Sequence, residues 1–281
     1  MSLPDFLIIG AMKCGTSTLQ AQLAHQKGVF MSTPKEPNYF SDDQIYARGR
    51  SWYEALFADA APGDLKGEAS THYTKLPTYP QTLPRMRAML DAPRLVYMIR
   101  NPMVRAVSHY IHEWTEGRVG SDAREAFHAT PEIAAYGFYG MQIAPFAEAY
   151  GPDRILLTSL EQISADPEAA FAEIRDFLGL PYGAAWVHDM PAQNVSAARM
   201  RRLPMQGLLI DNPVATSMRR ALVPKALRNW VRARRTMTTR PDIPDDLQDR
   251  LKAEFLADRA RLAELFPGHP ALELCYPFAP S

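Results

Sequence analysis

Short apolar runs recur along the chain, separated by longer segments in which apolar residues repeat at helical spacing. Three of these runs are rich in Ile, Leu and Val, which is typical of strands buried on both faces of a parallel sheet. A shorter run at 28–31 is also strand-like. The three predicted strands are Phe6–Ile9, Arg94–Ile99 and Arg154–Thr158.

Helical patterns occupy the intervals between these strands. The alternation predicts an α/β fold, a parallel sheet flanked by crossover helices. A later amphipathic pattern at Pro244–Phe266 predicts a helical C-terminal part. We therefore expect a single domain over residues 1–281. The other predicted helices are Ser17–His25, Ser51–Ala58, Pro102–Glu116, Tyr136–Tyr150 and Pro167–Gly179.

Residues 199–240 form a strongly basic stretch in which Asp211 is the one acid. Within the single domain we interpret 195–243 as a mobile lid or an acceptor-binding segment. A basic amphipathic helix over 218–237 would give a peripheral membrane contact instead. A charged face that is simply solvated is the third interpretation.

Composition narrows the function classes. Hydrophobic content of 47% suffices for a packed core, and 31 basic side chains balance 31 acidic ones. A net charge of zero argues against a long-range electrostatic field that would attract nucleic acid. Two cysteines give no disulfide framework, and no run approaches the roughly 20 apolar residues of a membrane span. We predict a cytoplasmic, bacterial protein without a transmembrane segment.

The segment 6–19 joins the first predicted strand to a hydroxyl-rich helix start. Its two glycines have the spacing of a Walker-type phosphate loop, but position 16 is not the Walker lysine, and a lysine lies within the loop instead. Backbone N–H groups and the helix dipole at such a start favour an anion. Helix capping by the hydroxyls is the alternative. The predicted phosphate-binding residues are Lys13, Cys14, Gly15, Thr16, Ser17 and Thr18.

A second candidate segment follows the strand that ends at 99. Arg100 and Ser108 lie eight residues apart, one ending the strand and one about two turns into the next helix. This spacing lets a guanidinium group and a hydroxyl bind one phosphate. Arg105 lies on the same helix, where it either assists or pairs with a surface acid such as Glu113 or Glu116.

Four segments together resemble the sulfotransferases that use 3′-phosphoadenosine 5′-phosphosulfate (PAPS), including the heparan sulfate and Golgi-type enzymes. The loop at 10–18 is similar to that family's 5′-phosphosulfate loop, and Arg100-Asn-Pro-Met-Val-Arg105-Ala-Val-Ser108 to its 3′-phosphate segment. Lys35-Glu36-Pro37-Asn-Tyr-Phe40 and Gly67-Glu68-Ala-Ser-Thr-His72-Tyr73 match in the expected order. The resemblance covers most of residues 5–180.

The resemblance implies a sulfotransferase fold and transfer of a sulfuryl group from PAPS to a hydroxyl or amine. It implies that Glu68 is the general base and that Lys13 stabilises the leaving phosphate. His72 is the alternative base, since small-molecule members use a histidine. Thr71 departs from the family's usual proline.

Weaker assignments complete the predicted site. Lys35, Glu36 and His72 would contact the acceptor, with a structural ion pair as the alternative for Glu36. Tyr139 would help hold the nucleotide, with a core position as its alternative. We expect no metal, because no His/Cys cluster has ligand spacing.

Two other functions remain open on the sequence. A nucleotide kinase predicts Lys at position 16 and an acidic magnesium ligand after a strand. A non-catalytic nucleotide- or membrane-binding module predicts a lost base. The acceptor stays undefined among small molecules, carbohydrates and lipids.

Overall fold

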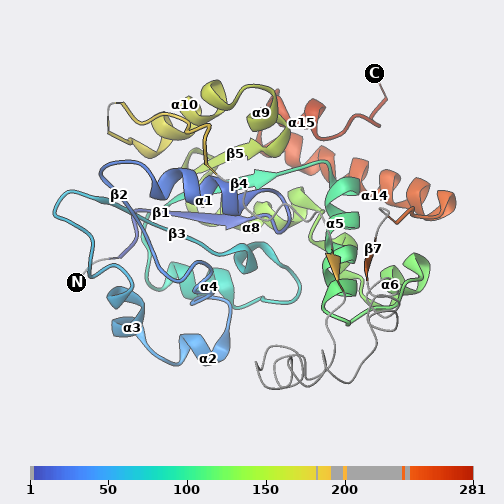
Figure 1. Cartoon of the computed structure of the whole chain (residues 1–281), viewed down its shortest axis with the longest axis horizontal. Coiled ribbons are helices and arrows are strands. Elements are labelled where there is room, and N and C mark those ends of the chain that lie inside the picture. Colours follow the sequence, from blue (N-terminus) through green and yellow to red (C-terminus); the bar gives the residue numbers. More distant parts are fainter. Residues whose placement is uncertain (1–2, 182, 191–198, 201–235, 238–240, 281) are drawn as a thin grey trace, which may run out of the picture.

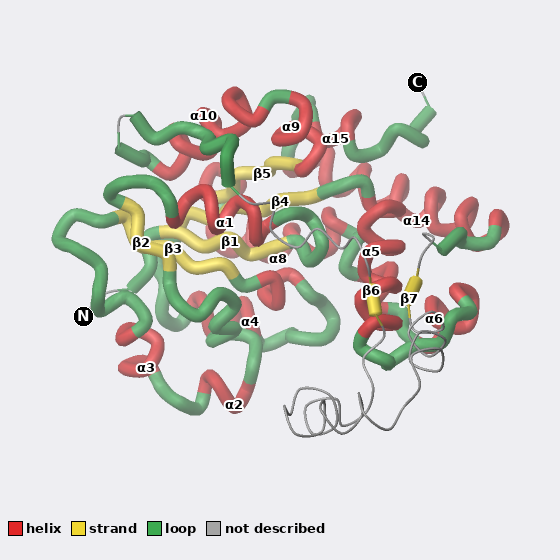
Figure 2. The backbone as a smooth tube through the Cα atoms, in the orientation of Figure 1, coloured by secondary structure: helices red, strands yellow, loops and turns green. Residues whose placement is uncertain are grey.

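The computed structural model describes residues 3–181, 183–190, 199–200, 236–237 and 241–280. Its centre is a parallel sheet in the order β2-β3-β1-β4-β5, flanked by helices (Figures 1 and 2). The five strands are β1 (Phe6–Gly10), β2 (Val29–Met31), β3 (Leu65–Ala69), β4 (Arg94–Ile99) and β5 (Ile155–Ser159). The predicted α/β fold is thereby confirmed, and each predicted strand lies within one residue of its observed bounds.

Strand β3 was not among the predicted strands, because its sequence Leu-Lys-Gly-Glu-Ala has no apolar run. Its pairing is nevertheless tight: Phe6 of β1 lies opposite Gly67. A Cβ atom at Gly67 would come within 2.2 Å of the Phe6 ring, so glycine is what allows the two strands to approach. Tertiary packing therefore sets this strand where local propensity does not.

The helices in the first two thirds of the chain lie between the strands or directly after the last one. Two expected boundaries were wrong by three residues. The predicted helix Ser51–Ala58 ends at Ala55. The predicted helix Tyr136–Tyr150 starts at Tyr139, where the Asp258 carboxylate accepts from the N–H groups of Gly140 at 2.7 Å and Met141 at 2.8 Å. The helices are α1 (Thr16–Ala24), α2 (Asp43–Tyr46), α3 (Arg50–Ala55), α4 (Thr82–Arg87), α5 (Pro102–Thr115), α6 (Ala123–Ala129), α7 (Glu132–Ala135), α8 (Tyr139–Tyr150), α9 (Leu160–Ala165) and α10 (Pro167–Leu178), with short 3₁₀ helices η1 (Thr71–Thr74) and η2 (Pro152–Arg154).

The predicted helical C-terminal part is present as α14 (Asp245–Leu265) and α15 (Ala271–Leu274), and α14 packs along α8. The short strands β6 (Arg199–Met200) and β7 (Thr236–Met237) pair antiparallel. The expected lid or acceptor-binding segment 195–243 and the expected membrane contact 218–237 otherwise lie outside the described residues, apart from 241–243. No helix within the described ranges is both long and apolar enough to cross a membrane.

The order of the strands positions a site. After β1, the chain forms β2 and β3, which lie in the sheet to one side of β1. It then crosses to β4, which pairs with the other edge of β1. Ligands of open α/β sheets bind at the carboxyl ends of the strands where this direction changes. The loops after β1 and β4 therefore flank the expected crevice.

Candidate functional site

The loop between β1 and α1 presents a helix start without a protein partner for its charge. Gly15 occupies the N-cap position with φ 94°, a left-handed conformation that suits glycine. Among the described residues no side chain caps α1, and the first turn of the helix holds no acidic residue. The hydroxyls of Thr16, Ser17 and Thr18 therefore do not act as caps at this end, and the helix start is open to an anion.

Lys13 and Arg100 meet at this loop. Lys13 lies in the loop with φ 69°, and its carbonyl accepts a long hydrogen bond of 3.5 Å from Nη1 of Arg100. Asn101 caps α5 through its side chain, which accepts from the N–H groups of Met103 and Val104. Ser108 lies two turns along α5 and is half-buried. The two segments predicted to bind phosphate thus come together at the carboxyl ends of adjacent strands.

Two of the predicted nucleotide contacts are side chains of the core. Cys14 is fully buried, its thiol lies 3.5 Å from the Tyr139 hydroxyl, and burial raises the pKa of this thiol to about 11. Tyr139 is also fully buried, and its hydroxyl donates to the Arg100 carbonyl at 2.7 Å. The structure therefore assigns Tyr139 a supporting position beneath the loop rather than a direct contact with a nucleotide. Cys14 can offer a ligand its backbone, not its buried thiol.

Glu68 lies on β3 and is fully buried, so it is not an exposed loop acid. Neither carboxylate oxygen forms a hydrogen bond of good geometry within the described part of the chain. Burial raises the pKa of Glu68 to about 7, although the nearby hydroxyls of Tyr73 and Tyr53 act in the opposite direction. A carboxyl group of this kind can exchange a proton near neutral pH, once a substrate reaches it.

The Lys35–Glu36 pair is anchored at the end of β3. The Glu36 N–H donates to the Ala69 carbonyl at 3.0 Å, and its carboxylate pairs with Lys35 Nζ at 2.7 Å. Burial acts to raise the pKa of Glu36, but the adjacent Lys35 ammonium outweighs this effect and lowers it overall. The predicted ion pair is therefore present, and it lies on the Glu68 side of the phosphate loop.

His72 is a weak candidate for a base. Its ring stacks on Tyr79 with centroids 4.7 Å apart, and burial together with the Lys75 charge lowers the pKa of His72 to about 4. The ring is therefore neutral at pH 7, but its Nδ1 atom is buried without a hydrogen-bond partner in the described structure.

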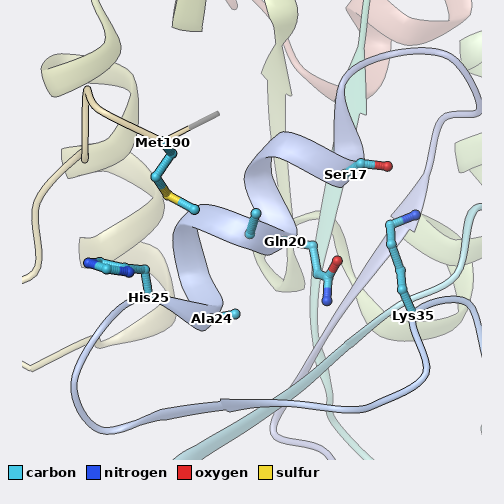
Figure 3. Close-up of a pocket in the computed structure, with 7 residues that line it drawn as sticks. Ser17, Gln20, Ala24, His25, Lys35 and Met190 are labelled. Carbon is cyan, nitrogen blue, oxygen red and sulfur yellow. The ribbon is translucent and has the colours of Figure 1, made fainter. Parts of the chain in front are cut away.

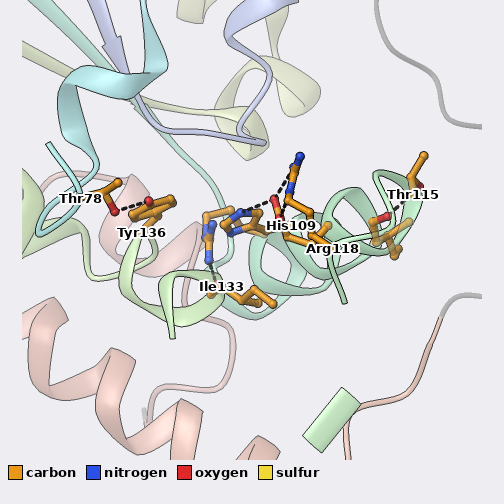
Figure 4. A network of polar contacts seen from close by, with 9 residues as sticks. Thr78, His109, Thr115, Arg118, Ile133 and Tyr136 are labelled. Carbon is orange, nitrogen blue, oxygen red and sulfur yellow. Dashed lines mark hydrogen bonds and ion pairs between the residues drawn. The ribbon is translucent and has the colours of Figure 1, made fainter. Parts of the chain in front are cut away.

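A buried polar network beside the loop was not anticipated from the sequence. The predicted surface pair of Arg105 is wrong, because this side chain is fully buried and donates to the Ile133 carbonyl. Glu113 pairs instead with His109, 3.3 Å away, and with Arg118 (Figure 4). The periodicity of α5 places Arg105 and His109 on one face, but it cannot tell whether that face is solvated.

A groove of about 460 Å³ runs along α1 beside the Lys35–Glu36 pair. Figure 3 shows Ser17, Gln20 and Lys35 around one end of this groove, with His25 and Met190 at the other. Two alanines, Ala21 and Ala24, complete its lining. The groove therefore begins at Ser17, two residues after Gly15 of the phosphate loop, and follows α1 to His25.

The described residues contain no group of three or more His, Cys, Asp or Glu side chains placed to hold a metal ion. The anion-binding features are accordingly those of the loop, of Lys13 and of the Arg100 segment.

Comparisons with known proteins agree with this arrangement. A family model described as the sulfotransferase domain matches residues 3–241. Human heparan sulfate glucosamine 3-O-sulfotransferase 6 is 28% identical over 185 residues, which cover 63% of this chain and 52% of that protein. The membrane-associated sulfotransferase kil1 of Dictyostelium discoideum is 33% identical over 113 residues, which cover 39% of this chain and 23% of that protein.

The chain spans about half the length of the human relative. A crystal structure of a sulfotransferase from Alicyclobacillus acidocaldarius has a TM-score of 0.68 at 22% identity, covering 97% of this chain and 100% of that one. At 22% identity, the likeness between the two structures shows a shared fold and nothing further. Because the family model matches most of the sequence, this chain belongs to the sulfotransferase domain family.

Proposed function

We propose that this protein is a PAPS-dependent sulfotransferase that acts on a hydroxyl or amine acceptor. The observation that carries the proposal is the meeting of Lys13 and Arg100 around an uncapped helix start, at the carboxyl ends of β1 and β4. These residues fit a donor with two separate phosphate groups. When bound, the donor supplies the sulfuryl group and its phosphate leaving group.

The loop and Lys13 would hold the 5′-phosphosulfate. The N–H groups at the start of α1 point at the anion, and the ammonium of Lys13 stabilises the charge that develops on the bridging oxygen. Arg100 and Ser108 would hold the 3′-phosphate through a guanidinium and a hydroxyl. A nucleotide without a 3′-phosphate would leave the Arg100 segment unpaired, which gives the site its selectivity.

Glu68 would take the acceptor proton. The acceptor oxygen or nitrogen forms a bond to sulfur, the bond from sulfur to the bridging oxygen breaks, and the proton passes to the Glu68 carboxylate. The side chain is enclosed, and the hydroxyls of Tyr53 and Tyr73 lie beside it. Catalytic hydrogen bonds often tighten only when substrate is present, so this enclosure is compatible with a base that the acceptor must reach.

The groove along α1 would receive the acceptor, with Lys35, Glu36 and His72 near its entrance to the reaction centre. The relatives' names describe sulfation of a glucosamine in heparan sulfate, so carbohydrate is the first acceptor class to test. Lipids and small alcohols form the next classes. A cytoplasmic, bacterial setting and the absence of a metal requirement stay predictions.

The nucleotide-kinase alternative lacks its lysine, because position 16 is Thr and the strand β4 leads into Arg100. The alternative of a non-catalytic nucleotide- or membrane-binding module can be distinguished from the proposal only by measuring whether the protein turns over a substrate.

The test is calorimetric binding of 3′-phosphoadenosine 5′-phosphate, beside ADP and ATP without metal. We expect the 3′-phosphorylated ligand to bind at least about tenfold tighter than ADP, equivalent to about 1.4 kcal/mol. An Arg100→Met variant should remove this preference while ADP affinity changes little. Equal or tighter binding of ADP or ATP by the wild-type protein would contradict the proposal.

A further inference from the structure

Lys75 is a buried lysine near the carboxyl ends of the strands, where the candidate site lies. Neither the sequence motifs nor the proposed mechanism uses it. Its exposed fraction is 7%. It follows η1 directly, and the preceding Thr74 donates its hydroxyl to the Ile9 carbonyl at 2.8 Å. This bond fixes Lys75 beside the end of β1, where the phosphate loop begins.

The ammonium of Lys75 lies against an aromatic ring that is itself held by two contacts. Its Nζ lies 5.5 Å from the centre of the Tyr136 ring. The Tyr136 hydroxyl bonds to the Thr78 hydroxyl at 2.5 Å, and the Tyr136 ring also stacks on His109 with centroids 5.4 Å apart (Figure 4). A lysine packed in this way loses little further freedom when it binds an anion.

Charged side chains from several elements surround this ammonium. The acids among them are already engaged: Glu36 pairs with Lys35, and Glu113 with Arg118 and His109. Lys75 forms no ion pair with any other described residue. The titratable groups that act on it or respond to it are Lys13 of the loop, Glu36 after β2, His72 of η1, Arg105, His109 and Glu113 of α5, and Tyr136 after α7.

A buried cation without an ion pair is costly, and the cost falls when an anion is bound beside it. Burial is the main cause that lowers the pKa of Lys75 to about 8, with the Lys13 and Arg105 charges acting in the same direction. Glu36 and Glu113 oppose this effect but do not cancel it. The site thus favours an additional negative group.

The position of Lys75 identifies which group this is. The phosphates lie on the loop and the β4 side, where Arg100 and the start of α1 hold them in the proposed mechanism. Lys75 follows η1, which comes after β3 and Glu68 in the chain, and its ammonium interacts electrostatically with both Lys13 of the phosphate loop and Glu36. Between the phosphate and the acceptor lies the sulfuryl group.

We propose that the Lys75 ammonium binds the oxygens of the transferred sulfuryl group, as a second cation beside Lys13. This inference rests on the proposed function. In the reaction the acceptor–sulfur bond forms and the bond from sulfur to the bridging oxygen breaks, while the acceptor proton goes to the base. Lys75 keeps its protons throughout and stabilises negative charge on the sulfonate oxygens.

The experiment compares two ligands that differ only in the sulfuryl group. Binding of PAPS and of 3′-phosphoadenosine 5′-phosphate is measured by calorimetry without acceptor, for the wild type and for Lys75→Met, Lys75→Arg and Lys66→Met. Methionine keeps the aliphatic packing on Tyr136 and removes the charge. Lys66 is the control, because it pairs with Asp5 at 3.2 Å outside the candidate site.

We expect Lys75→Met to weaken PAPS binding by roughly tenfold or more, the loss of a charge-assisted hydrogen bond, and to leave binding of the desulfated nucleotide within about twofold. Lys75→Arg should recover most of the PAPS affinity. In the wild type, PAPS affinity should fall between pH 7 and 9 as Lys75 loses its proton, whereas the arginine variant should hold its affinity over this range.

An unchanged PAPS affinity in Lys75→Met overturns the inference. An equal loss for both ligands overturns it as well, because Lys75 would then support the phosphates or the fold. If the wild-type protein binds neither nucleotide, the proposed function itself fails, and that outcome is distinct from the other two.

Discussion

The two sides of strand β1 contribute to the candidate site in different ways. On the β4 side, the loop, Lys13 and Arg100 form the proposed anion site largely from backbone geometry, with partly accessible side chains. On the β3 side, Glu68 and Lys75 are enclosed, and their properties depend on tyrosines and charges from distant segments. The first side is adapted to hold a ligand, and the second to tune the protonation and charge of a few groups.

This difference predicts that substitutions on the two sides separate binding from turnover. The largest expected effect is that of Glu68→Gln. Removing a general base costs on the order of 10²–10⁴ in turnover, while affinity for the desulfated nucleotide should stay within a few-fold. Steady-state assays with a sulfated-product readout measure the first quantity, and calorimetry the second.

The matched control is Glu54→Gln, which alters another buried carboxylate, one paired with Arg50 at 2.7 Å on α3. It should leave turnover nearly unchanged. Retained activity in Glu68→Gln would remove the base assignment and make His72 the next residue to test.

Lys13→Met should lower both turnover and nucleotide affinity, because Lys13 serves binding as well as catalysis in the proposed mechanism. Loss of a cation at the leaving oxygen is expected to lower turnover by roughly 10²–10³-fold. Nucleotide affinity should fall less, since the N–H groups of α1 still hold the phosphate. Lys27→Met, an exposed change near the far end of α1, serves as the control. Equal losses in the two variants would show that Lys13 has no particular role.

The enclosure of Glu68 also has a consequence for stability. Its folded pKa of about 7 lies above the ordinary glutamate pKa of 4.5, so the folded protein retains a proton that the unfolded chain releases. The contribution of Glu68 to stability is therefore full below about pH 4.5 and is lost as pH rises toward 7. The loss should be about 3 kcal/mol, following from the difference between the two pKa values.

Chemical denaturation of the wild type and Glu68→Gln at pH 5 and pH 8 measures this term. The variant should be relatively more stable at pH 8 than at pH 5. A stability difference that does not change with pH would indicate that Glu68 titrates normally, and the case for it as a base near neutral pH would weaken.

The sequence predicted the β4 side well, because its signals are local. A strand followed by Gly10-x-x-Lys13-x-Gly15, and a strand followed by Arg100, specify an anion site through neighbouring residues. On the β3 side, the segment Gly67–Tyr73 resembled the family, but the residues around it predicted neither a strand nor the burial of Glu68. Gly67 pairs with Phe6, and Glu68 is covered by Tyr53 of α3, so strand and burial both arise from contacts between distant segments.

Tyr139 lies between these two situations. The sequence predicted that this residue would matter, but not that it would be buried beneath the loop. Its hydroxyl connects the Cys14 thiol and the Arg100 carbonyl across α8 and the loop. Tyr139 begins α8, whose start is held by Asp258 of the C-terminal helix α14. A contact that needs three segments leaves no recognisable spacing in any one of them.

The smallest predicted effect tests this link. Tyr139→Phe removes a hydrogen bond that should be worth about 1 kcal/mol of unfolding free energy, and it frees the Arg100 carbonyl beneath the phosphate site. Tyr110→Phe removes a comparable bond to the Gly120 carbonyl, at 3.2 Å and away from the loop. Both variants should lose similar stability in denaturation, but only Tyr139→Phe should weaken nucleotide binding, by a few-fold. If the two variants bind nucleotide equally well, Tyr139 supports the core and not the loop, and the β4 side holds its ligand without this bond.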